Sequence, residues 1–306
     1  MTVRRHRYFG SLGAILVAVV SLPICFVTAL ADDPPVGPAL PSGGVATGGA
    51  RPVDGIMDNS FLIEEAYNQE AGVVQHIFTA NHLLSRRRGP DDQITALSFT
   101  QEWPLYSQRH QISFTATHYA IDTGGRKESG FGDLMLNYRY QAFFDERTLE
   151  AFAPRISLVL PTGRKLAGFG EDTVGMQCNL PFSTTWNGRW FTHLNAGATF
   201  LPNALSAGGR DVTHFNLGAG VIYAPTSDLH FVVEWIGNWQ NAPDGAGRLK
   251  HDFVPVISPG LRRAINLAGG AQLVLGAAMP VGLNRNAPDF GVFLYVSFEH
   301  RFTRES

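Results

Sequence analysis

Three observations predict an all-β chain, and more specifically a transmembrane antiparallel β-barrel of about 12 strands, within a range of roughly 10 to 14. Polar and apolar residues alternate along many runs of the 306-residue sequence, which is the pattern of strands with two different faces. Several runs reach roughly ten to thirteen residues, the length with which a tilted strand crosses a bilayer. Aromatic residues gather near the ends of these runs, as in the interfacial girdles of membrane barrels.

The first 31 residues predict an export signal. They begin with three arginines, continue through an apolar stretch and end on a small-residue motif with Ala29 and Ala31, which a signal peptidase reads as a cleavage site. An uncleaved membrane anchor is the alternative, because the apolar stretch approaches spanning length. Pro23 and the Ala-x-Ala ending favour cleavage.

Charge and cysteine content then narrow the class of protein. Cleavage would remove three arginines from the 24 basic residues and none of the 26 acidic residues, leaving a net charge of about −5 with histidine neutral. This balance argues against a nucleic-acid partner, which needs a basic face. Only Cys178 would remain, so an intrachain disulfide is excluded and the fold must depend on other interactions.

Two regions are expected in the mature chain. Residues 32–60 are rich in proline, glycine and small residues and show no apolar periodicity, so they predict a flexible periplasmic leader. Residues 61–306 contain the alternating runs, broken by turn clusters such as "WNGR" and "PTSD", and predict the barrel itself.

The alternating runs also predict which side chains face the lumen. In "GDLMLNYRYQ", Leu136 and Tyr138 share one side while Asn137 and Arg139 share the other. Because the outer face of a membrane barrel is apolar and its interior is polar, the polar side should line the lumen. The lumen candidates taken from such faces are Asp133, Asn137, Arg139, Arg155, His214, Asn216, Glu234 and Asn238.

The last run, "FGVFLYVSFEHRF" at 290–302, has one almost wholly apolar side. It resembles the terminal strand by which bacterial outer-membrane barrels are recognised for assembly, with Phe298 and Phe302 as the signal residues. Two features depart from that pattern, because His300 stands where an aromatic is usual and four residues follow Phe302. A soluble β-sandwich can end in the same way.

The stretch "FLIEEAYNQEAGVVQHI" at 61–77 is unusually polar, with Glu64, Glu65, Glu70 and His76 close together. Three hypotheses account for it. In the first, these four side chains and Gln75 line the lumen or its periplasmic mouth. In the second, the segment is a short helix or plug inside the pore, and in the third, two of the carboxylates form a catalytic acid pair.

Enzyme chemistry has little support elsewhere in the sequence. No serine and histidine stand at a spacing typical of a nucleophilic pair, and no HxH or CxxC string occurs. We therefore predict that the protein is not an enzyme, with no catalytic residues, no cofactor and no metal site.

Four motifs carry a resemblance to a known family: "GFGDLMLNYRYQ" at 130–141, "LPTG" at 160–163, "GFG" at 168–170 and "NSFLIEEAYNQEAGVVQHI" at 59–77. They resemble the outer-membrane family named after the meta-pathway of phenol degradation. The resemblance implies an outer-membrane β-barrel described as a transporter and sometimes found with the degradation of aromatic compounds. It implies no catalytic residue.

The expected function is therefore passive or facilitated passage of small solutes through the outer membrane of a bacterium. The resemblance extends this to hydrophobic or aromatic solutes. The expected partners are outer-membrane lipid, a small-molecule solute and the barrel-assembly machinery. The alternatives are a non-conducting structural or assembly barrel and a lipid-modifying outer-membrane enzyme.

Overall fold

A computed structural model describes residues 55–56, 59–85, 92–123, 125–165, 168–243 and 248–302. The predicted signal peptide, with Ala29 and Ala31, and most of the predicted leader lie outside these residues. Within the described ranges, no helix has both the length and the apolar character needed to cross a membrane.

One sheet contains all the strand segments of the described residues. They are β1 (Val73–Ser85), β2 (Asp92–Leu105), β3 (Ser107–Thr123), β4 (Arg126–Phe131), β5 (Leu134–Tyr140), β6 (Phe143–Asp145), β7 (Glu150–Phe152), β8 (Arg155–Leu160), β9 (Gly175–Trp186), β10 (Trp190–Ala204), β11 (Arg210–Thr226), β12 (Leu229–Pro243), β13 (Leu249–Asn266), β14 (Gln272–Ala278), β15 (Val281–Gly282) and β16 (Phe290–Arg301). Two short 3-10 turns, η2 (Leu205–Ala207) and η3 (Ala268–Gly270), lie between strands.

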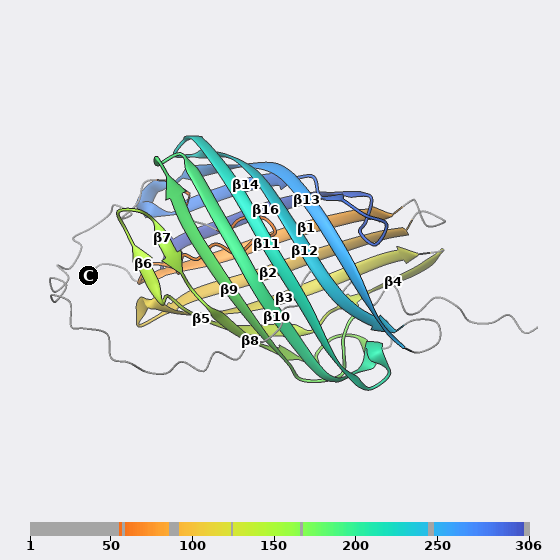
Figure 1. The fold of residues 1–306 in the computed structure, drawn as a ribbon. Helices are drawn as coiled ribbons and strands as arrows, with labels where there is room; N and C mark the ends of the chain where they lie inside the picture. Colours follow the sequence, from red (N-terminus) through yellow and green to blue (C-terminus); the bar gives the residue numbers. More distant parts are fainter. Residues whose placement is uncertain are drawn as a thin grey trace, which may run out of the picture.

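The sheet closes into a barrel of twelve antiparallel strands (Figure 1). Three barrel strands are interrupted: β4 and β5 both pair with β3, β7 and β8 both pair with β9, and β14 and β15 both pair with β13 and β16. The last strand closes on the first, with Val74 opposite His300. The predicted fold class is thus confirmed.

The alternation read from the sequence matches the two faces of the wall. Along β11, Phe215 and Leu217 are 53% and 46% exposed, whereas His214 on the opposite face is buried. The same holds on β5, where Leu136 is exposed and Arg139 is buried. Successive side chains of a strand point to opposite faces, so the barrel has an apolar outer belt and a polar interior.

The two ends of the barrel differ. At one end most connections are short, such as Asn187–Gly188 between β9 and β10, whose φ angles of 48° and 69° are those of a type I′ hairpin turn. We call this the short-turn end; β1 begins there and β16 ends there. The opposite, long-loop end has longer connections, including residues 161–174 and 283–289.

The apolar core of the barrel interior includes residues that precede the first strand. Ile56 and Phe61 pack in one buried cluster with Ile222, Val232 and Phe293 from the wall. Ile56 and Ser60 belong to the predicted flexible leader, yet both are buried. The predicted boundary at residue 60 is therefore wrong at its C-terminal side, because the chain enters the barrel interior before that residue.

Candidate functional site: a plugged lumen

Residues 59–70, here called the plug, run inside the barrel without forming a helix or a strand. Backbone groups of such a segment need partners from elsewhere when they are buried. The barrel wall supplies them from side chains: Asn195 accepts from the Glu64 amide at 2.9 Å, Ser183 from Ala66 at 2.8 Å, Gln141 from Asn68 at 2.9 Å and Gln111 from Gln69 at 2.7 Å. Of the three hypotheses for this stretch, the geometry matches a plug inside the pore.

Glu234 on β12 holds the beginning of the plug. Its carboxylate accepts hydrogen bonds from the backbone amides of Phe61, Leu62 and Ile63, at 3.0 to 3.1 Å. The Glu234 side chain is fully buried. Consecutive amides around one carboxylate form an anion-binding concavity, so the plug backbone itself neutralises a wall charge.

Arg139 on β5 holds the middle of the plug with a positive charge. Its guanidinium donates to the carbonyl oxygens of Tyr67 at 2.6 Å and Glu65 at 3.2 Å, and to Asn68 Oδ1 at 2.7 Å. It also donates to Glu64 Oε1 at 3.1 Å. A planar fork with five N–H donors suits such a multiple contact. Arg139 therefore binds the plug backbone as well as a plug charge.

Glu64 is the acidic centre of the plug. Arg155 Nε lies 2.9 Å from Glu64 Oε2, and Asn179 Nδ2 donates to the same oxygen at 2.6 Å. Burial raises the pKa of the Glu64 carboxyl, but the charges of Arg155 and Arg139 and the hydrogen bonds from Asn179 and Arg155 outweigh it, so its pKa lies below the usual value. Glu64 is therefore ionised at neutral pH and paired.

Glu65 forms a second ion pair with a residue of the wall that the sequence analysis missed. Arg262 Nη2 on β13 lies 2.9 Å from Glu65 Oε1, and Arg262 Nη1 donates to the Asn59 carbonyl at 3.0 Å. In the sequence, Arg262 stands beside Arg263, and only one of two neighbouring strand residues can face inward. The alternation of residues along β13 could have identified Arg262 as the inward-facing arginine. It places Arg262 on the same side of the strand as Ser258 and Val254, which are buried.

A small hairpin, β6–β7, covers the plug at the short-turn end. Tyr67 donates its hydroxyl to the Leu149 carbonyl at 2.8 Å, and its ring meets Phe144 edge-on with centroids 5.9 Å apart. Ala66 and Tyr67 share a buried cluster with Ala151 from the hairpin. The hairpin thus fastens the plug by apolar contact and one hydrogen bond.

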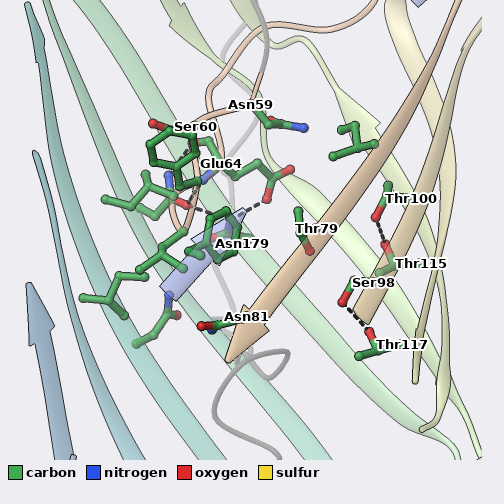
Figure 2. A pocket seen from close by; sticks show the side chains of 18 of the residues that line it. Asn59, Ser60, Glu64, Thr79, Asn81, Ser98, Thr100, Thr115, Thr117 and Asn179 are labelled. Carbon is green, nitrogen blue, oxygen red and sulfur yellow. Dashed lines mark hydrogen bonds between the residues drawn. The ribbon is translucent and has the colours of Figure 1, made fainter. Parts of the chain in front are cut away.

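A cavity of about 330 Å³ lies in the lumen next to the plug. Plug residues 59–64 form one part of its lining, and side chains of the wall form the rest (Figure 2). Thr79 and Asn81 of β1 and several hydroxyls of β2 and β3 line it on one side. The lumen is therefore divided into a plugged part and a hollow part.

The structure gathers most of the predicted lumen residues inside the barrel. Glu64 and Glu65 are on the plug, and Glu70 follows at its end, where its carbonyl accepts from the Val73 amide at 3.0 Å. The wall residues are placed on the inner face: Asn137, Arg139, Arg155, His214, Asn216, Glu234 and Asn238. Of all these, Glu64, Asn137, Arg155, Asn216 and Asn238 line the cavity.

One of the predicted lumen residues is placed elsewhere. His76 lies on the outer face of β1, where its ring stacks on Phe99 and Phe298 and its Nε2 is 3.3 Å from His300 Nε2. The lumen assignment of His76 is wrong, because β1 begins at Val73 and turns its odd-numbered residues, such as the fully buried Gln75, inward.

Asp133 anchors a loop and does not line the cavity. Situated between β4 and β5, it accepts from the Gly163 amide at 2.8 Å and from the Glu171 amide at 2.9 Å. A Cβ on Gly163 would lie 2.8 Å from Asp133 Oδ1, so this close approach requires glycine there. Asp133 therefore holds the loop of residues 161–174 beside the wall, and its assignment to the lumen stays a prediction.

Comparisons with known proteins identify no family for this chain. No protein-family model matches the chain, and no curated protein matches it, so the resemblance to the phenol meta-pathway family stays a prediction. Among solved structures, the β domain of the Bordetella autotransporter Brka is similar, with 12% identity over 76% of this chain and 100% of that chain and a TM-score of 0.45. The barrel assignment here depends on the strand pairings alone.

Among the described residues, no group of three or more His, Cys, Asp or Glu side chains is placed to hold a metal ion.

Proposed function

We propose that this protein is a bacterial outer-membrane β-barrel through which small solutes pass when the plug leaves its position. The main support for this proposal is that polar contacts hold the plug in the barrel. Arg139, Arg262 and Glu234 of the wall bind the plug backbone and the plug carboxylates. A segment meant only to fill a barrel would be held as well or better by apolar packing, since buried ion pairs contribute little net stability.

Polar docking also suits a reversible movement. When the plug leaves, the wall charges meet water in the lumen, where charged side chains cost little. A wholly apolar wall would be left exposed to water at a cost of about 25 cal/mol per Å², whereas here only the apolar part of the wall around Phe61 carries that cost. The open state is thus accessible for this barrel, and the docked state is its closed gate.

The placement in the outer membrane is supported by the outer face and by the ends. The outward side chains of β5, β11 and β16 are large and apolar, with Leu136, Leu217 and Leu294 between 43% and 50% exposed. An even number of antiparallel strands puts the beginning of β1 and the end of β16 at the same, short-turn end. In bacterial outer-membrane barrels the short turns face the periplasm, which matches the predicted export signal.

Single-channel recording in a planar bilayer tests this function. Residues 32–306, the chain left after the predicted cleavage, should conduct rarely, whereas the same chain without residues 59–70 should show discrete, salt-dependent current steps. The matched control removes residues 35–46, an equal length outside the described residues, and should behave like the full mature chain. A plug-deleted barrel that is folded by its heat-modifiable gel mobility yet carries no current would instead establish a non-conducting structural barrel.

A further inference from the structure

We propose that the cavity beside the plug is a binding site for an uncharged solute that combines a hydrocarbon face with hydroxyl groups. The inference rests on the proposed function, because it names the class of solute that is held at the closed gate. Three features of the cavity wall carry it: the pairing of its charges, a set of hydroxyl pairs and a set of amide oxygens without partners.

The charged groups at the cavity are already paired. Glu64 is bound by Arg155 and Arg139. Glu102 accepts from Gln111 Nε2 at 2.7 Å and lies 3.8 Å from Arg139 Nη2. A charged solute would lose its hydration on entering the cavity and would gain no unpaired counter-charge among these groups. The wall therefore favours an uncharged molecule.

Hydroxyl groups form pairs across β2 and β3 on one side of the cavity. Ser98 and Thr117 lie 2.9 Å apart, as do Thr100 and Thr115, with the oxygen atoms of each pair in contact (Figure 2). Within the Thr100–Thr115 pair one hydroxyl donates to the other, so this pair still has one O–H to donate and lone pairs to accept. A hydroxyl of a solute can use both capacities, whereas a hydrocarbon can use neither.

Amide oxygens at the same cavity require hydrogen-bond donors. Asn179 donates from Nδ2 to the carboxylate of Glu64, which can only accept, so its Oδ1 is fixed as an acceptor. That oxygen is buried and has no hydrogen-bond partner among the described residues, and the same holds for Oδ1 of Asn81 and of Asn216. A buried acceptor without a partner costs about 1–3 kcal/mol. A solute O–H group that meets one of these oxygens after a small rotation of the amide would remove this penalty.

The remaining wall is apolar and limits the size of the solute. Hydrocarbon surface comes from Ile236 of β12, Val254 and Val256 of β13 and Phe293 of β16. Leu83 and Met135 add to it. The volume of about 330 Å³ is at the small end of ligand sites, which span roughly 300–1,000 Å³. One ring or a short chain fits this space, with its hydroxyls toward β2 and β3.

Three probes of similar size test the class of solute: cyclohexylmethanol, ethylcyclohexane and cyclohexanecarboxylate. Their binding to refolded residues 32–306 in detergent is measured by isothermal titration calorimetry. The alcohol should bind at least about tenfold more tightly than either of the other two, the equivalent of about 1.4 kcal/mol. Equal or tighter binding of the carboxylate or of the hydrocarbon would overturn the inference, as would the absence of any binding.

A matched pair of variants distinguishes binding of the alcohol in the cavity from its uptake into the detergent micelle. Thr100→Val combined with Thr115→Val keeps side-chain shape but removes one hydroxyl pair, and it should weaken binding of the alcohol about tenfold. Thr184→Val, on the outward face of β9, should leave it unchanged. If both variants bind alike, the cavity hydroxyls are not the site. If the alcohol does not bind as expected but the plug-deleted barrel conducts, the inference about the solute is refuted and the proposed function stands. If the alcohol binds as expected but the plug-deleted barrel carries no current, the proposed gate is refuted and the inference about the cavity stands.

Discussion

Glu65 of the plug and Arg262 of the wall form an ion pair of 2.9 Å inside the barrel, with their side chains 3% and 1% exposed. The two residues are 197 positions apart in sequence. A buried pair gains little net stability, because both ions lose their water, but removal of one partner leaves an expensive unpaired charge. The pair therefore fixes where the plug docks, and it lets the plug leave when both ions regain water.

Replacing Arg262 by methionine should undock the plug. Glu65 would then be buried without its nearest cation, at a cost of roughly 3–5 kcal/mol. Undocking is measured by the reactivity of a thiol introduced by Ala66→Cys in a Cys178→Ser background. Position 66 suits this measurement because Ala66 is fully buried in the docked plug. That thiol should react with a maleimide about a hundredfold faster when Arg262→Met is present.

The control for this prediction removes both charges together. Adding Glu65→Gln to Arg262→Met abolishes the unpaired charge and should restore most of the protection of the thiol introduced at position 66. Equal labelling in the single and the double variant would show that the ion pair does not position the plug.

Acid should open the gate through Glu64. The pKa of Glu64 is lowered in the docked plug, so its contribution to docking is complete above the ordinary carboxyl pKa and is lost as pH falls through the lowered value. Channel opening should therefore rise as pH falls below about 4.5. Glu64→Gln should open more often at pH 7 and respond less steeply to acid. An identical pH response in both proteins would contradict this role.

Removing the charge of Glu234 should loosen the beginning of the plug. Hydrogen bonds to a charged acceptor contribute about 1.5–3 kcal/mol, and Glu234→Gln weakens those from Phe61, Leu62 and Ile63. Hydrogen exchange at these amides should quicken about tenfold or more. Glu128→Gln, at a partly exposed carboxylate paired with Arg126, is the matched control. Unchanged exchange at residues 61–63 in Glu234→Gln would refute the anchoring role.

Tyr67→Phe should release the β6–β7 hairpin while leaving the barrel intact. The variant loses one hydrogen bond to Leu149, about 1 kcal/mol, but keeps the ring contact with Phe144. Hydrogen exchange should quicken about fivefold in residues 143–152. Tyr140→Phe, on the outer face, should leave this hairpin unaffected. Faster exchange in both variants would mean that the effect is not specific to the Tyr67 contact.

The barrel wall was predictable from the sequence because its signal is local. Two neighbouring residues such as Leu136 and Asn137 indicate the two faces of a strand, and Asn187–Gly188 indicates a turn. Lumen residues chosen from clear alternation, such as Arg139 and Glu234, were accordingly placed inside. His76 was assigned wrongly because the start of β1 cannot be read from a polar stretch to within one residue, and a shift of one residue reverses the facing.

The plug could not be predicted in the same way. Its backbone has no periodicity, and its partners come from β3, β5, β9, β10, β12 and β13. The sequence shows that Glu64 and Glu65 are close together, but it does not show that Arg155 binds one and Arg262 the other. Such pairings arise only once the barrel has closed.

A disulfide between plug and wall tests the central claim most directly. The Ala66 amide lies 2.8 Å from Ser183 Oγ, so Ala66→Cys and Ser183→Cys are placed to cross-link in a Cys178→Ser, Arg262→Met background. We expect no current through the oxidised protein and discrete current steps once a reductant is added, with each single-cysteine protein conducting under both conditions. Equal current before and after reduction of a verified cross-link would contradict the account, because solutes would then cross the barrel without movement of the plug.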